Sequence, residues 1–181
     1  MKMNAFVLAL GMFALAASYA DTLVTSCQVG SGKTIQLIKG KEITQDVGVY
    51  YLVQNGKQKP LFGSLSTSTG SVISSRCIGT TRGVLMVAGE FSSNYTQGVV
   101  VGYDQGANRI QRLDFAERAL PRWVYLNKTS IKVLIPNEGN EQPGKYLLYE
   151  SGGKRAVEGH GTDEMPSKRG FEVVDLAAPP A

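Results

Sequence analysis

The run Val49-Tyr50-Tyr51-Leu52-Val53-Gln54, followed by Asn55-Gly56 and then by residues 57–62, decides the predicted fold. Aromatic and β-branched residues dominate the run, as is typical of a strand. Asn-Gly tolerates the two positive φ angles of a type I′ turn, whose twist matches the strands that it joins. Pro60 cannot donate a ladder hydrogen bond, so we expect the returning strand to lie at a sheet edge. This segment predicts an antiparallel β-hairpin.

Three later segments repeat the pattern of strand, polar turn and returning strand. They are 98–103 with 109–113, 123–126 with 131–135, and 146–150 with 154–157. Propeller-like blades would also place such hairpins in series, but their irregular spacing favours an ordinary meander. Windows with helical spacing are nearly absent. We therefore expect a single all-β domain at 21–176, a barrel or sandwich of about eight to ten antiparallel strands.

Local signals predict one short helix and two loops. Asp114 can cap a helix at 115–120, Glu117 stands at the third position of a capping box, and Pro121 ends the segment. The segment 64–75 is almost all Ser, Thr and Gly, and 137–144 contains two glutamates and a proline, so both are expected to be loops. The tail 177–181 is expected to be disordered.

The first twenty residues predict export. One lysine precedes the apolar run 6–17, which is too short to span a bilayer, and Ser18 and Ala20 supply the small residues that signal peptidase reads. We expect cleavage before Asp21, a periplasmic or secreted protein, and no transmembrane segment after cleavage. The short signal is at least as typical of a bacterial protein as of a eukaryotic one. The alternative, lipidation at Cys27, is disfavoured because 19–23, with a charge at Asp21, separates this cysteine from the apolar run.

Cys27 and Cys77 are the only cysteines. Export places them where disulfides persist, so we expect one structural bridge between them. A closed loop of that length stabilises the fold by about 4 kcal/mol in the chain-entropy model. A redox role would require a partner thiol, as in Cys-x-x-Cys, and the sequence has none.

Motifs of enzyme sites are incomplete in this chain. Gly30-Ser31-Gly32-Lys33-Thr34 lacks the first glycine of a phosphate-binding loop, and a strand-like run follows where a helix is required. The Ser-x-x-Lys spacing at 151–154 falls on a Gly-Gly turn rather than on a helix. We therefore expect no nucleotide or other cofactor, and no acyl-enzyme chemistry.

His160 is the single histidine, within Glu158-Gly159-His160-Gly161-Thr162-Asp163-Glu164. A loop of this composition could gather an imidazole and carboxylates around a metal, but zinc sites use three or four ligands on ordered elements. No G-x-S-x-G elbow supplies a nucleophile for this histidine to activate. We expect neither a metal site nor an enzyme. A hydrolase with an unrecognised site around His160 remains the alternative.

The basic residues are concentrated in one stretch of the chain. Without the signal the formal charge falls from +4 by one lysine, to +3. Four arginines at 109–122 precede a stretch rich in glutamate, and they are Arg109, Arg112, Arg118 and Arg122. Aligned on one face, they would attract an acidic protein or polymer. In the alternative reading they are a solvated face that pairs with the acidic stretch. A nucleic-acid partner is not expected, because exposed aromatics do not interleave with these cations.

The sequence thus predicts an exported, non-enzymatic binding module for an acidic protein or envelope polymer, with Arg109, Arg112, Arg118 and Arg122 as the contact surface. One concrete form is an inhibitor of an exported hydrolase, since a small disulfide-linked β domain can insert a loop into an active-site cleft. A structural or assembly component of the cell envelope is the alternative from another class.

Overall fold

The computed structural model describes residues 21–30, 32–139, 142–151 and 159–177. In these ranges the chain forms thirteen β-strands and no helix. The predicted signal peptide, the predicted returning strand 154–157 and residues 178–181 lie outside them. Every strand pairing is antiparallel, and the strands form two sheets.

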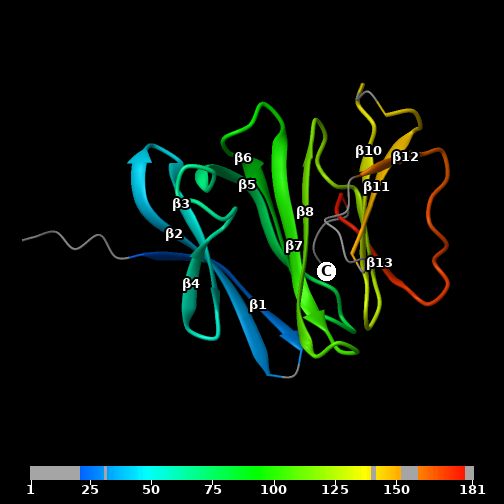
Figure 1. Cartoon of the computed structure of the whole chain (residues 1–181), viewed down its shortest axis with the longest axis horizontal. Helices are drawn as coiled ribbons and strands as arrows, with labels where there is room; N and C mark the ends of the chain where they lie inside the picture. Colours follow the sequence, from blue (N-terminus) through cyan, green and yellow to red (C-terminus); the bar gives the residue numbers. More distant parts are fainter. Residues whose placement is uncertain (1–20, 31, 140–141, 152–158, 178–181) are drawn as a thin grey trace, which may run out of the picture.

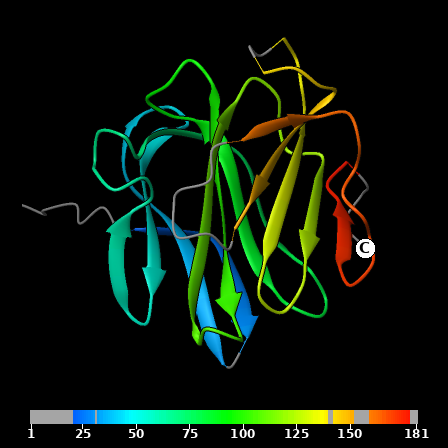
Figure 2. The ribbon, with the colours of Figure 1, turned by 45° about the vertical axis from the view of Figure 1, so that its right-hand side comes forward.

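The first sheet holds the first eight strands in the order β1-β2-β3-β5-β6-β7-β8, and β4 pairs with β3 at its side. The strands are β1 (Thr22–Gly30), β2 (Lys33–Thr44), β3 (Val47–Gln54), β4 (Lys57–Pro60), β5 (Thr69–Ile78), β6 (Val84–Glu90), β7 (Thr96–Asp104) and β8 (Arg109–Glu117). β3 pairs with β5 through Gly48 and Val49 and with β4 through 51–54. On its other side β3 pairs with β2 along 50–54, so β4 is a short edge strand beside β3, at the left in Figure 2.

The second sheet has the order β12-β11-β10-β9-β13. Its strands are β9 (Trp123–Leu126), β10 (Ile131–Pro136), β11 (Tyr146–Glu150), β12 (His160–Thr162) and β13 (Glu172–Asp175). This sheet stands beside β8, on the right in Figure 1. Its strands place Val124, Val133 and Leu147 against the first sheet.

Strands β6 and β7 are buried on both faces. Leu85 and Val87, with neighbours on β7, pack against side chains of β1, β2 and β3. Met86 and Val100 point to the other face and pack against the second sheet. The first sheet thus curls so that its N-terminal strands cover one face of its own centre. A continuous apolar run is the pattern expected of a strand with two buried faces.

The all-β antiparallel fold is confirmed, and the described strands form two sheets that do not close into a barrel. The number of strands exceeds the expected eight to ten because the second sheet contributes short strands such as β12 and β13. Pro60 ends β4, whose one strand partner in the described chain is β3, so the predicted edge strand is confirmed. Asn55 and Gly56 have φ values of 50° and 70°, as a type I′ turn requires.

The predicted helix at 115–120 is wrong. Phe115 and Glu117 belong to β8, and Phe115 is paired with Gly98 of β7. A Cβ atom at Gly98 would lie 2.0 Å from the Phe115 ring, so this glycine makes room for the ring in the core. Alternation of buried and exposed residues outweighs the local capping signal. The predicted loop 64–75 is also partly wrong, because β5 begins at Thr69.

The predicted disulfide joins Cys27 of β1 to Cys77 of β5, with 5.1 Å between the Cα atoms. The Thr25 and Ser75 hydroxyls, each two residues earlier, are in contact through a hydrogen bond. The bridge therefore fastens the curled N-terminal strand to the central strands. Among the described residues, no helix has the length and apolar character needed to cross a membrane.

Candidate binding cleft

A cleft of about 900 Å³ lies between the β3–β4 hairpin and β8. The hairpin contributes the face that it turns toward the core, and β8 contributes two charged side chains. The lining residues are Leu52, Gln54, Asn55, Lys57, Lys59, Pro60, Phe62, Gly63, Arg112 and Asp114. Three are cations and one is a carboxylate, so the cleft carries a formal charge of 3 − 1 = +2.

The inner face of the hairpin changes from apolar to basic along its length. Leu61 follows β4 and returns opposite Tyr50, and both side chains are buried. Two pairs further out, on the same face, Leu52 is opposite Lys59, and at the tip Gln54 is opposite Lys57. Directly opposed residues of an antiparallel pair share one face. The two lysines therefore occupy the positions that continue the core face outward, and both are exposed.

The backbone edge of β4 offers little for another strand to pair with. The Leu61 N–H donates to the Tyr50 carbonyl at 3.0 Å, so in the alternating ladder Gln58 and Pro60 direct their backbone groups outward. Pro60 has no N–H, and its carbonyl accepts from the Gly63 N–H at 3.3 Å. The edge is protected from strand addition.

β8 closes the other side of the cleft with Arg112 and Asp114. These residues are opposite Val101 and Val99 of β7, on the face that carries the N-terminal core. The guanidinium Nε donates to the two Asp114 carboxylate oxygens at 3.0 and 2.8 Å. A terminal guanidinium nitrogen donates to the Leu61 carbonyl at 2.7 Å. Arg112 thereby joins the edge strand to the end of the hairpin.

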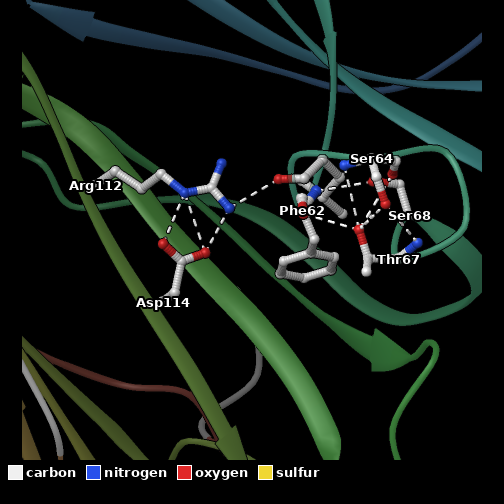
Figure 3. A network of polar contacts seen from close by, with 7 residues as sticks. Phe62, Ser64, Thr67, Ser68, Arg112 and Asp114 are labelled. Carbon is white, nitrogen blue, oxygen red and sulfur yellow. Dashed lines mark hydrogen bonds and ion pairs between the residues drawn. The ribbon is translucent and has the colours of Figure 1, made fainter. Parts of the chain in front are cut away.

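The segment after the hairpin is held by its own hydrogen bonds, which Figure 3 shows beside the Arg112 pair. Ser68 is fully buried, its hydroxyl accepts from the Phe62 N–H at 2.8 Å, and its carbonyl accepts from the Tyr50 N–H at 2.9 Å. The Thr67 hydroxyl donates to the Phe62 carbonyl at 2.8 Å. These bonds fix Phe62, whose ring centre lies 5.9 Å from the Arg112 guanidinium carbon. The cleft therefore has a preorganised aromatic wall beside its cations.

The four arginines of the predicted contact surface are not on one face. Arg109 and Arg112 differ by an odd number of positions on β8, so they point to opposite faces. Arg118 follows the strand and lies over the Tyr95 ring at 5.9 Å. Arg122 forms an ion pair with Asp175 at 2.9 Å. The Ala177 N–H and this guanidinium lower the pKa of Asp175. Of the four, the structure brings only Arg112 into the cleft.

His160 is exposed at the start of β12, the outer strand of the second sheet, and is paired with Leu148. Within the described ranges, no group of three His, Cys, Asp or Glu side chains is placed to hold a metal ion. Glu158, which the sequence places next to this histidine, lies outside those ranges.

Sequence reasoning missed Lys57, Lys59 and Phe62 as members of a site. The signal for the lysines was present, since a two-residue turn at Asn55-Gly56 fixes the register and assigns both to the face of Tyr50 and Leu52. The position of Phe62 depends on the buried Ser68, which composition alone assigns to a loop.

Comparison of the chain with models of known protein families, with curated proteins and with solved structures finds no match.

Proposed function

We propose that the protein is an exported, non-enzymatic binding module whose cleft between the β3–β4 hairpin and β8 takes an acidic group of a protein or envelope polymer. One observation carries the proposal. Lys57 and Lys59 occupy inner-face positions of a hairpin whose preceding inner residues, Tyr50 and Leu52, are buried core. Two amines on this face leave a basic cleft where apolar side chains would have extended the core.

The charges of the cleft favour an anion over a neutral ligand. Asp114 is already engaged by Arg112, so its carboxylate balances that guanidinium and leaves the charge of the two lysines uncompensated in the lining. Phe62 provides an apolar wall that excludes water from one side. Charge interactions beside a low-dielectric wall are stronger than on an open surface. An acidic side chain with an aliphatic stem, such as glutamate, fits this combination.

The same features support the more specific form, an inhibitor of an exported hydrolase. The turn of the β3–β4 hairpin is exposed and consists of Asn55 and Gly56. Arg112 and the Ser68 network hold its base, so the hairpin is preorganised, which lowers the entropic cost of binding. An acidic rim around a hydrolase active site would meet the lysines next to that tip.

The test measures binding of poly-L-glutamate to the mature protein by isothermal titration calorimetry. Lys57→Gln combined with Lys59→Gln should weaken binding roughly tenfold at low salt, given up to about 1 kcal/mol for each exposed charge contact. The affinity of the unmodified protein should fall as salt rises from about 20 to 150 mM, because a shorter Debye length screens exposed charges.

The matched control is Lys168→Gln combined with Arg169→Gln, which removes two exposed charges away from the cleft. This variant should retain the affinity of the unmodified protein. Equal loss in both double variants would mean that the polymer senses only net charge, and the cleft would then have no specific role.

A further inference from the structure

A second basic site lies at the turn end of the molecule, on the opposite face of the central sheet. Gln111 and Arg112 are consecutive on β8, so they point to opposite faces. Arg112 reaches the cleft described above, whereas Gln111 accepts a hydrogen bond from Arg82 at 2.6 Å. Arg82 belongs to the loop between β5 and β6 and is only 3% exposed.

Arg82 is a buried cation with neutral hydrogen-bond partners. One terminal nitrogen donates to the carbonyls of Asn127 at 2.8 Å and Ser130 at 3.3 Å, in the β9–β10 turn. Its buried Nε has no acceptor among the described residues. Burial lowers the pKa of this guanidinium, and attraction to Asp104 partly offsets that effect. A buried charge without a directly paired counter-charge costs free energy that a bound anion would recover.

A cavity of about 710 Å³ adjoins this arginine. Lys128 and Thr129 of the β9–β10 turn lie at its rim and are exposed, and Phe171 provides an apolar wall. The Lys128 carbonyl accepts from the Gln105 N–H at 3.1 Å, so the β7–β8 turn supports the β9–β10 turn. The cavity thus combines a buried guanidinium, an ammonium group and a hydroxyl.

The carboxylates near the cavity are engaged elsewhere. Glu172 lines the cavity and accepts from the Thr80 and Thr81 N–H groups at 2.6 and 3.0 Å. Burial raises the pKa of Glu172, but these hydrogen bonds outweigh it and hold the pKa below its usual value. Asp104 accepts from the Gly106 and Ala107 N–H groups at 2.9 and 3.0 Å. Neither forms an ion pair with Arg82 within the described part of the chain.

We infer that this cavity binds a small oxyanion, a carboxylate or phosphate group, between Arg82 and Lys128. The anion supplies the missing counter-charge of the buried guanidinium, and the exposed Lys128 ammonium group provides a second positive charge at the rim. The site is independent of the proposed cleft, because the two have no lining residue in common.

The experiment compares thermal unfolding of the mature protein in sodium phosphate, sodium acetate and sodium chloride of equal ionic strength at pH 7. At phosphate near ten times the dissociation constant, mass action should raise Tm by about 3 °C over chloride. A similar rise in acetate would assign a carboxylate site, and a rise in phosphate alone a phosphate site. The Arg82 Nε–H resonance in ¹H–¹⁵N NMR should shift over the same concentration range.

Variants separate binding from a purely structural role of the arginine. Lys128→Gln changes an exposed residue, so the protein should fold normally and lose most of the Tm rise. Lys168→Gln, and Lys57→Gln with Lys59→Gln, should keep the rise, which distinguishes this site from the cleft. Identical Tm values in the three salts, or an Arg82 Nε–H signal that phosphate leaves unmoved, would show that Arg82 serves only to hold the β9–β10 turn.

Discussion

The central strands and the β3–β4 hairpin are both antiparallel pairs, yet they differ in what their inner faces carry. In β6 and β7, Leu85, Val87, Val99 and Val101 continue the same core from pair to pair without a polar residue. In the hairpin, that core ends at Leu52, and Lys59 and Lys57 take the next positions. The central pair therefore stabilises the fold. The outer part of the hairpin adds little packing, and its side chains are available for a ligand.

Loss of the disulfide should have the largest effect on stability. Cys27→Ser combined with Cys77→Ser removes the covalent link between β1 and β5, which joins two residues 50 positions apart in the sequence. The free energy of unfolding should fall by about 4 kcal/mol in the chain-entropy model. Urea denaturation of the oxidised protein and the double variant measures the difference. A loss below about 1 kcal/mol would mean that the curled N-terminal strands need no covalent link to β5.

Truncation in the central strands should come next. Leu85 of β6 is fully buried against the N-terminal strands, so Leu85→Ala should cost about 3 kcal/mol through lost burial and the cavity that remains. Leu65→Ala is the matched control, because Leu65 is 56% exposed, and it should cost under about 0.5 kcal/mol. Equal losses in the two variants, measured by urea denaturation, would contradict the assignment of β6 to the core.

Arg112 lies on β8, which pairs with the central strand β7, and it donates to the end of the hairpin. Its loss should have an intermediate effect on the free energy of unfolding. Arg112→Ala removes the donor to the Leu61 carbonyl, and an unsatisfied buried carbonyl costs about 1–2 kcal/mol. Arg109→Ala, at the exposed start of the same strand, should change the free energy of unfolding by less than about 0.5 kcal/mol. If Arg109→Ala destabilises as much as Arg112→Ala, the guanidinium contact with the hairpin contributes nothing specific.

The hairpin lysines should have the smallest effect on stability. Lys57→Gln with Lys59→Gln should leave the free energy of unfolding, measured by urea denaturation, within about 0.5 kcal/mol of the parent value, because exposed charges contribute little to folding. A larger loss would mean that the two lysines stabilise the hairpin. The outer part of the hairpin would then contribute to the stability of the fold, as the central strands do.

Much of the fold was predictable because its signals are local. Asn55-Gly56 fixes the turn, the register and the face of every hairpin residue. The helix prediction failed because Asp114 and Glu117 form a genuine capping pattern, whereas pairing of Phe115 with Gly98 requires a partner 17 positions earlier. A non-local strand pairing that buries an aromatic ring outweighs the local helix propensity of the segment.

The candidate sites were less predictable than the fold. The face of Lys59 could be counted from the turn, but the cleft also needs β8, which lies far along the chain. Arg82 has no distinguishing neighbour in Thr80-Thr81-Arg82-Gly83, and its burial results from the β9–β10 turn packing over it. Arg112 of the basic stretch lines the cleft, but charge density could not show that Arg109 faces the other way.

The central claim, that the cleft recognises acidic groups, is tested most directly by ¹H–¹⁵N NMR of residues 21–181 titrated with acetylated hexaglutamate at low salt. We predict that the largest shifts occur at Lys57, Lys59, Phe62 and Gly63 and in the Arg112 Nε–H signal, and that they disappear in the Lys57→Gln, Lys59→Gln variant. Shifts of equal size at Arg109, Arg118 and Lys168, with no concentration at the cleft, would contradict the claim.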